Sequence, residues 1–194
     1  MSKLHKEKQQ LRMQMREIIR QITSDEKKRF SRMITDKILQ LPEYLNSRVI
    51  MAFLSMEVEY DTSEFIDRAI ESGKVICAPK VDWDSWSMHP VRICNSSDVI
   101  VDNHNLKEPK GDEQVLPDEI DLILVPGLAF DIRGKRLGRG GGFYDTFLSR
   151  ADVRRAVKLA PTFDCQVLNS IPVSDKDVSI DIIVTPHKLL RFRV

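Results

Sequence analysis

The sequence predicts an α/β protein built on a mostly parallel sheet. Helix-like and strand-like segments alternate along the chain, and the segment 49–54 is apolar at every position. A continuous apolar run of this length is typical of a strand that is covered on both faces, as in parallel sheets. We find no internal repeat or linker, and 194 residues fit one domain, so we expect a single domain over residues 1–194.

Two helices are expected before the sheet. The first follows from apolar residues at helical spacing, namely Leu11, Met15, Ile18, Ile19 and Ile22. Basic residues cover the rest of this helix, and they either form a solvated face or reach an anionic ligand. The second helix begins at a capping box, from Thr23 to Glu26, and Pro42 helps to end it.

The alternating part of the chain starts at the strand 49–54. Residues 61–64 resemble a helix start, Gly73 suits the end of that helix, and residues 75–78 form the next strand. Two strands joined by such a crossover predict a right-handed βαβ unit. Further strands are expected at residues 88–93, 121–125, 156–159 and 180–184. The polar segment 95–117 is expected to be an irregular, ligand-covering loop.

The composition excludes several classes of function. The 30 Lys and Arg residues nearly balance 29 Asp and Glu residues, so no overall basic field favours nucleic acid or an anionic membrane. Cys77, Cys94 and Cys165 form no Cys-x-x-Cys pair, and we expect reduced thiols. The first residues lack the apolar run of a signal peptide, and no stretch approaches a membrane span. We therefore expect a cytoplasmic protein with no nucleic-acid or membrane partner.

The most informative stretch is residues 136–145, which we call the glycine loop. Gly138, Gly140, Gly141 and Gly142 are half of the eight glycines in the chain, and a helix is expected from Tyr144. Glycines at this density permit positive φ angles and a close backbone approach. Consecutive N–H groups and the following helix N-terminus then form a site for an anion. The sequence therefore predicts a phosphate-binding loop, although a basic glycine turn on the surface is the simpler alternative.

Charged residues around the glycine loop support the phosphate prediction. Four cations are expected to contact phosphate oxygens: Arg133, Lys135, Arg136 and Arg139. Asp145 is an odd neighbour for an anion unless Mg2+ bridges its carboxylate and the phosphates. Lys135 is followed by Arg136 rather than Ser or Thr, so the loop is not a Walker A motif. Phe143 replaces the third glycine of a dinucleotide-binding fingerprint.

The glycine loop, spelled RLGRGGGFYD, resembles the signature of the 5-formyltetrahydrofolate cyclo-ligase family, also called methenyltetrahydrofolate synthetase. Segments elsewhere match the family in order: Lys8-x-x-Leu-Arg12, residues 53–62 (FLSMEVEYDT), residues 126–131 (PGLAFD) and residues 179–184 (SIDIIV). The resemblance thus covers nearly the whole chain. It implies a three-layer α/β/α sandwich, similar to sugar-phosphate isomerases and CoA transferases.

The resemblance also implies an activity. Members of the family use ATP and Mg2+ to convert 5-formyltetrahydrofolate into 5,10-methenyltetrahydrofolate, with release of ADP and phosphate. The formyl oxygen attacks the γ-phosphate, N10 of the folate closes on the activated carbon, and phosphate leaves. Phosphoryl transfer depends mainly on positioning and charge neutralisation, so no catalytic His or Cys cluster is required.

The resemblance assigns roles to individual residues. The ATP contacts are Lys8, Arg12, Arg136, Leu137, Gly138, Arg139, Gly140, Gly141, Gly142, Phe143 and Tyr144. The folate contacts are Leu54, Glu59, Arg139, Gly140, Gly141, Gly142 and Phe143. Lys8 and Arg139 are the expected catalytic cations, and Asp145 and Asp181 the expected metal ligands. From the residues alone, Glu59 could equally be a solvated strand-end carboxylate and Asp181 a sheet-end acid. We infer that Glu59 accepts hydrogen bonds from pterin N–H donors.

The sequence departs from the family at three positions. Phe143 stands where Tyr is common, Gly141 where some members have Lys, and His104 where some place an aromatic side chain. Trp83 and Trp86 lie nearby in sequence, and we expect them to pack in the core or at a sheet edge rather than on folate.

Two other functions fit parts of the sequence. A sugar-phosphate isomerase or CoA-binding transferase would share the fold but needs a carboxylate or Lys base at the phosphate site. A non-catalytic RNA-binding module would rest on the basic first helix alone. We expect a monomer or weak homodimer.

Overall fold

The computed structural model describes residues 2–192. Its helices are α1 (Lys3–Arg20), α2 (Ser24–Ile38), α3 (Pro42–Leu45), α4 (Ser63–Glu71) and α5 (Phe143–Leu148), with 3-10 turns η1 (Pro117–Glu119), η2 (Ala151–Val153) and η3 (Asp164–Gln166). Its strands are β1 (Val49–Met51), β2 (Val75–Asp82), β3 (Ser87–Ile93), β4 (Val99–Val101), β5 (Lys107–Pro109), β6 (Leu122–Leu124), β7 (Ala129–Asp131), β8 (Arg136–Leu137), β9 (Val157–Pro161), β10 (Val167–Leu168), β11 (Ile182–Val184) and β12 (Leu189–Arg191).

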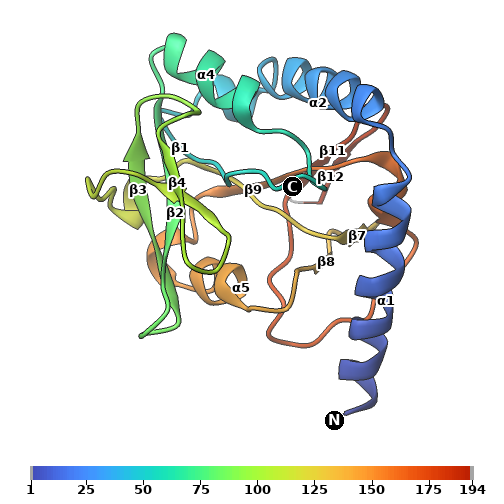
Figure 1. Cartoon of the computed structure of the whole chain (residues 1–194). Helices are drawn as coiled ribbons and strands as arrows, with labels where there is room; N and C mark the ends of the chain where they lie inside the picture. Colours follow the sequence, from blue (N-terminus) through green and yellow to red (C-terminus); the bar gives the residue numbers. More distant parts are fainter. Residues whose placement is uncertain (1, 193–194) are drawn as a thin grey trace.

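A seven-stranded sheet runs through the molecule in the order β12-β11-β9-β6-β1-β2-β3. The five inner strands, β11, β9, β6, β1 and β2, pair in parallel, and the two edge strands, β12 and β3, pair antiparallel. The parallel pair β1–β2 is joined through α4, as the strand–helix–strand pattern predicts (Figure 1). The α/β class and the mostly parallel sheet are therefore confirmed.

Alternate residues of each inner strand contribute to two separate cores. In β1, Ile50 packs into the core under α1, α2 and α4, whereas Met51 packs into the core on the other face. The first core contains Phe65 of α4, and the second contains Phe147 of α5. Figure 1 shows α2 and α4 together on one side of the sheet and α5 on the other. Helices thus cover both faces, which explains why the inner strands are apolar throughout.

The structure confirms the predicted start of α2 and the predicted glycine after α4. The capping box is present, since Thr23 Oγ1 accepts from Glu26 N and Glu26 Oε2 accepts from Thr23 N. Gly73, just beyond α4, has φ +79°, the left-handed conformation that ends many helices. The apolar stripe of α1 is narrower than predicted, because Met15 and Ile19 are buried but Ile18 is exposed.

Two predicted segments differ from the structure. The first strand ends at Met51 instead of residue 54, because the chain leaves the sheet there and turns toward α4. Residues 95–117 are not wholly irregular: they contain the antiparallel pair β4–β5, and Gln114 bridges to Val91 of β3. The same segment is folded against the β2–β3 hairpin, since Val81 N donates to Glu108.

A small second sheet holds the start of the glycine loop. Strand β7 pairs with β8 and β10, with Phe130 opposite Arg136. Within residues 2–192, no helix combines the length and the apolarity that a bilayer crossing requires.

Candidate active site

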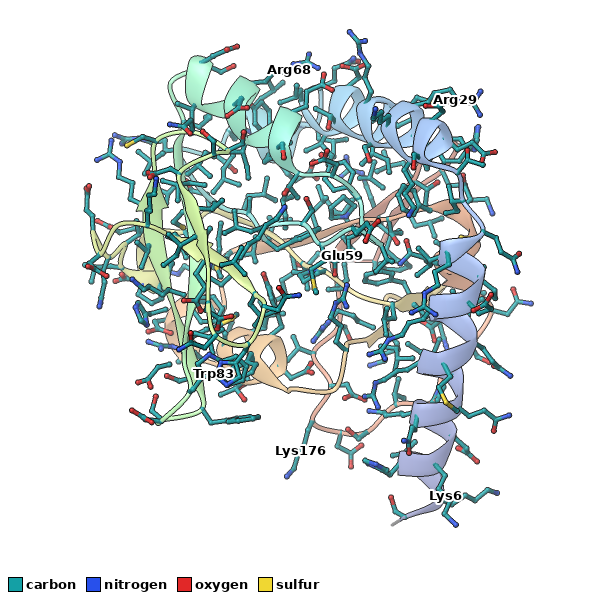
Figure 2. The ribbon with its side chains drawn as sticks, in the orientation of Figure 1. Lys6, Arg29, Glu59, Arg68, Trp83 and Lys176 are labelled. Atoms are coloured by element: carbon teal, nitrogen blue, oxygen red, sulfur yellow. The ribbon has the colours of Figure 1, made fainter. Side chains whose placement is uncertain are left out.

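A cavity of about 930 Å³ lies at one edge of the large sheet. Phe53 and Leu54 enter it just after β1, Pro126 just after β6, and Val81 from the second half of β2. The carboxyl ends of parallel strands share one edge of a sheet, which is where α/β proteins build ligand sites. The glycine loop, α1 and residues 174–178 complete the walls. In Figure 2, Glu59 lies between the sheet and α1, with Trp83 and Lys176 nearer the lower end.

The backbone of the glycine loop needs glycine at several points. Gly140 has φ +114° and Gly142 has φ +79°, conformations that L side chains rarely adopt. At Gly138 a Cβ would lie 2.8 Å from Nη1 of Arg136. The glycines therefore let the backbone turn tightly beside an arginine, as the sequence predicts.

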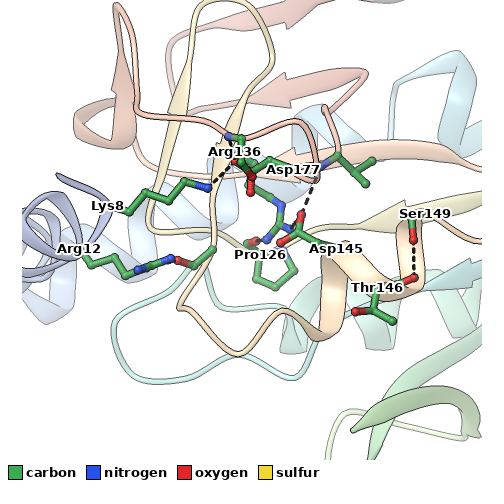
Figure 3. Close-up of polar contacts among 11 residues, drawn as sticks. Lys8, Arg12, Pro126, Arg136, Asp145, Thr146, Ser149 and Asp177 are labelled. Carbon is green, nitrogen blue, oxygen red and sulfur yellow. Dashed lines mark hydrogen bonds and ion pairs between the residues drawn. The ribbon is translucent and has the colours of Figure 1, made fainter. Parts of the chain in front are cut away.

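Arg136 and Asp145 form an internal ion pair in the floor of the loop. Arg136 Nη2 donates to Asp145 Oδ1 at 2.6 Å and its Nη1 to Pro126 O at 3.3 Å, and the Arg136 side chain is 3% exposed (Figure 3). Asp145 Oδ1 also accepts from Val178 N at 3.3 Å. The presence of Asp145 beside a predicted anion site is thus explained in part by its ion pair with Arg136. Arg136 Nε is buried and has no partner among the described residues.

Arg139 and Glu59 form an ion pair in the lining of the cavity. Nε and Nη2 of Arg139 donate to Glu59 Oε1 at 2.9 and 2.7 Å, and Met56 N donates to Oε2 at 3.0 Å. The Glu59 side chain is 8% exposed, so it is not a solvated strand-end carboxylate. Burial, followed by the Glu59 charge, raises the pKa of neighbouring Tyr144, which therefore stays a neutral phenol.

Helix α1 contributes two cations to the cavity. Lys8 Nζ lies 2.5 Å from Asp177 Oδ2, and Arg12 Nε donates to Gly138 O at 2.9 Å (Figure 3). Burial, together with Arg16, lowers the pKa of Arg12. The other basic residues of α1 do not line the cavity, and Lys3 pairs with Glu7 on the surface. Lys8 and Arg12 thus line the cavity, and their contact with an anionic ligand stays a prediction.

Aromatic side chains gather beside the glycine loop. Trp83 and Phe143 line the cavity with their ring centroids 5.4 Å apart, and His104 stacks on Trp83 at 3.8 Å. Trp86 stacks on Phe143 at 5.0 Å, and its indole N–H donates to Gly141 O at 3.0 Å. Both tryptophans lie in the turn of the edge hairpin, as expected, but only Trp83 of the two lines the cavity, whereas Trp86 is 55% exposed and contacts the glycine loop.

Three predicted residues lie outside the cavity. Asp181 precedes β11, where it accepts from Lys158 N at 2.9 Å, and it does not line the cavity with Asp145, so its role as a metal ligand stays a prediction. Arg133 pairs with Asp131, and Lys135 donates to Ser179 Oγ. Of the four cations near the glycine loop, only Arg136 and Arg139 line the cavity.

The segment 174–178 was not singled out from the sequence. Asp177 and Val178 line the cavity and contact Lys8 and Asp145, respectively. The only local signal is a short acidic turn, Ser174-Asp175-Lys176-Asp177, which is typical of any surface loop. Its role depends on tertiary contacts.

The acidic groups of the site can accommodate a metal only with help from a ligand. In the part of the chain that the structure describes, no cluster of three or more His, Cys, Asp or Glu side chains could hold an ion. Mg2+ commonly takes one or two carboxylates and completes its shell with phosphate oxygens and water. Asp145, with hydrogen bonds recorded only at Oδ1, fits that pattern.

Comparison with known proteins gives one consistent result. The model of the 5-formyltetrahydrofolate cyclo-ligase family matches residues 4–186. The mouse 5-formyltetrahydrofolate cyclo-ligase is 34% identical, covering 90% of this chain and 91% of the mouse protein. The enzyme of that name from Escherichia coli K12 is 28% identical, covering 88% and 95% of the two chains.

A solved structure agrees with these relatives. The NMR structure of Aquifex aeolicus 5,10-methenyltetrahydrofolate synthetase superposes with a TM-score of 0.84 at 27% identity, covering 96% of this chain and 93% of that one. The glycine loop, the α1 cations and the buried Glu59 all lie within the matched residues. The chain therefore belongs to the 5-formyltetrahydrofolate cyclo-ligase family.

Proposed function

We propose that this chain converts 5-formyltetrahydrofolate into 5,10-methenyltetrahydrofolate at the expense of ATP. The observation that carries the proposal is the arrangement of the cavity. The cavity is lined by cations from α1 and the glycine loop, by the aromatic rings of Trp83 and Phe143, and by the buried Glu59. The cations suit a triphosphate, and the aromatic rings suit a flat pterin with its aminobenzoyl group. The isomerase, transferase and RNA-binding alternatives are not favoured, because the chain belongs to the cyclo-ligase family.

In the proposed reaction the formyl oxygen forms a bond to the γ-phosphorus and the bond to ADP breaks. N10 then attacks the activated formyl carbon and loses its proton, and phosphate leaves with the former formyl oxygen. Lys8, Arg12 and Arg139 neutralise the phosphate charge that develops. Arg136 holds Asp145 and the start of the glycine loop in place. Gly140, Gly141 and Gly142 let the backbone approach both ligands.

Glu59 is proposed to orient the pterin. A carboxylate matches the paired N–H donors of the pterin amino-pyrimidine, and burial of Glu59 strengthens such hydrogen bonds. Leu54 and Phe143 supply apolar contacts for the ring system. Arg139 uses two of its five N–H donors on Glu59, so the others can bind a phosphate oxygen while that pair is kept.

Mg2+ is part of the proposal. Asp145 would hold it together with the phosphates, and the ion would neutralise charge on the triphosphate. The position of Asp181 outside the cavity does not support a direct role for that residue. A likeness of the fold to sugar-phosphate isomerases, a cytoplasmic location and a monomeric or weakly dimeric state remain predictions.

A spectrophotometric assay tests the proposal. Protein, MgATP and 5-formyltetrahydrofolate are mixed, and the absorbance of the methenyl product is followed against an ATP-free control. We expect product and ADP to appear in equal amounts. An absence of product above the control, with folded protein, would refute the activity, and ADP release independent of the folate would point to a different acceptor.

A further inference from the structure

Lys8 is held by one carboxylate from a distant part of the chain. Its ammonium lies 2.5 Å from Asp177 Oδ2, and both side chains are 14% exposed. Within residues 2–192, Asp177 is the one hydrogen-bond acceptor recorded for Lys8. An ammonium group has three donors, so two remain for an anion in the cavity.

Asp177 is itself fixed by its own turn. Ser174 N donates to Asp177 Oδ2 at 2.6 Å, and Asp177 N donates to Ser174 O. Burial alone would raise the pKa of Asp177, but the hydrogen bonds from Lys8 and Ser174 lower it below the usual range. The carboxylate is therefore ionised at neutral pH and rigidly placed.

The same turn also contacts the acid at the end of the glycine loop. Val178, the next residue, donates its N–H to Asp145 Oδ1 at 3.3 Å (Figure 3). One short segment thus contacts a cation from α1 and the acid at the end of the glycine loop. These partners lie 169 and 33 residues away in sequence.

We propose that Asp177 is a positioning residue that holds the Lys8 ammonium where the phosphates of ATP bind. This inference rests on the proposed function in placing ATP at Lys8. A lysine side chain on an exposed helix samples many rotamers, and the carboxylate selects one of them before the nucleotide arrives. Without the carboxylate, Lys8 would have to be ordered by the nucleotide itself, which weakens binding.

Equilibrium binding of a non-hydrolysable ATP analogue with Mg2+, measured by titration calorimetry without folate, tests this role independently of turnover. We expect Asp177→Asn to weaken binding about tenfold, the size typical of a lost hydrogen bond to a charged group. In a Lys8→Ala background, Asp177→Asn should have little further effect, because the two residues act as one unit. Unchanged affinity of Asp177→Asn, or an equal loss in both backgrounds, would overturn the proposal.

Two further variants control for charge and folding. Asp112→Asn breaks a Lys–Asp pair of the same kind, Lys80 Nζ to Asp112 Oδ1 at 2.6 Å, away from the cavity lining, and we expect less than a twofold change. If Asp177→Asn fails to fold, Asp177→Glu keeps the charge but displaces the ammonium, and it should bind the analogue more weakly than wild type; wild-type affinity there would contradict the proposal.

Turnover measurements separate this inference from the proposed function. In the cyclo-ligase assay, Asp177→Asn should raise the KM for ATP while the KM for 5-formyltetrahydrofolate stays within about twofold. A wild-type protein that binds the analogue but forms no methenyl product would refute the activity alone. The comparison of analogue binding by Asp177→Asn in the wild-type and Lys8→Ala backgrounds would still decide the role of Asp177.

Discussion

At the scale of single residues, the site consists of charges that neutralise one another. Arg136 pairs with Asp145, Arg139 with Glu59 and Lys8 with Asp177. These pairs differ in exposure, and exposure decides what each substitution does. A pair with a buried member supports the fold, whereas a pair open to the cavity is available for exchange with a ligand.

Arg139→Ala should abolish most of the activity and should also destabilise the protein. The Arg139 side chain is 32% exposed, but its partner Glu59 is 8% exposed and would lose its cation, so we expect a loss of about 2 kcal/mol of unfolding free energy. Loss of a guanidinium that is proposed to contact the phosphates should lower kcat/KM by about 100-fold or more. Arg150→Ala, which breaks an exposed pair with Asp152, is the matched control and should leave kcat/KM unchanged. Normal turnover by Arg139→Ala would remove Arg139 from the phosphate site.

Asp145→Asn should raise the Mg2+ concentration needed for activity and should also destabilise the protein. Its carboxylate is the ionic partner of the nearly buried Arg136, so we expect a loss of about 2 kcal/mol. Asp181→Asn should leave the Mg2+ titration unchanged, because Asp181 lies outside the cavity. Activity as a function of Mg2+, with urea unfolding of each variant, measures both effects. A right-shifted titration for Asp181→Asn would restore that residue as a metal ligand.

At the scale of elements, the glycine loop is shaped from both ends. Strand β8 holds its start against β7, and α5 follows its last glycine. The β2–β3 hairpin meets its middle, through the hydrogen bond from Trp86 to Gly141 O. The loop therefore owes its shape to glycine backbone freedom and to contacts from an element about 55 residues away in sequence.

Gly142→Ala tests the backbone requirement of the loop. Gly142 has φ +79° with open space around its Cα, so an added methyl group should be strained only through φ and cost about 1 kcal/mol. The strain should shift the neighbouring amide groups and raise the KM for ATP. Gly111→Ala is the control, since Gly111 also has open space but no positive φ. Equal stability of the two variants in urea unfolding would show that the left-handed conformation carries no cost.

At the scale of the whole molecule, the cavity draws on nearly the full length of the chain, from Lys8 to Val178. The two cores fix the strands whose ends frame it. Unfolding of either core should therefore dismantle the site, and buried groups in the cores report on that event. Cys77 of β2 is one such group.

Alkylation of the cysteines should follow their burial. Cys94 is exposed and should react rapidly with iodoacetamide, whereas burial raises the pKa of Cys77 to about 12 and should protect it until the protein unfolds. Mass spectrometry of the labelled peptides checks this. Labelling of Cys77 at the rate of Cys94 in native buffer would contradict the burial of β2.

The raised pKa of Cys77 also predicts a pH dependence with a definite sign. The thiol ionises near pH 8.5 in the unfolded chain but near 12 in the fold. Its contribution to stability is therefore complete below about pH 8.5 and decreases as the pH rises toward 12. Relative to Cys77→Ala, wild type should lose about 1.4 kcal/mol per pH unit in that window. Parallel stability curves for the two proteins would exclude this linkage.

The sequence by itself determined the class of fold and the chemical nature of the site. Apolar runs predict covered strands because burial depends on residue type, and the glycine loop predicts a backbone that turns beside cations because few other sequences permit it. The capping box at Thr23 and the left-handed Gly73 just beyond α4 follow from local hydrogen bonding and backbone freedom, so they too could be predicted.

Only the tertiary structure decided which of those residues meet. Arg133 and Arg136 are three positions apart, yet one pairs with Asp131 away from the cavity and the other lies in its floor. Asp181 matches a family motif but lies before β11, and Asp177, which no motif marks, contacts Lys8. Trp83 lines the cavity and Trp86 contacts the glycine loop because the turn of the β2–β3 hairpin packs against that loop. Such pairings depend on how distant elements pack, and local sequence carries no record of that geometry.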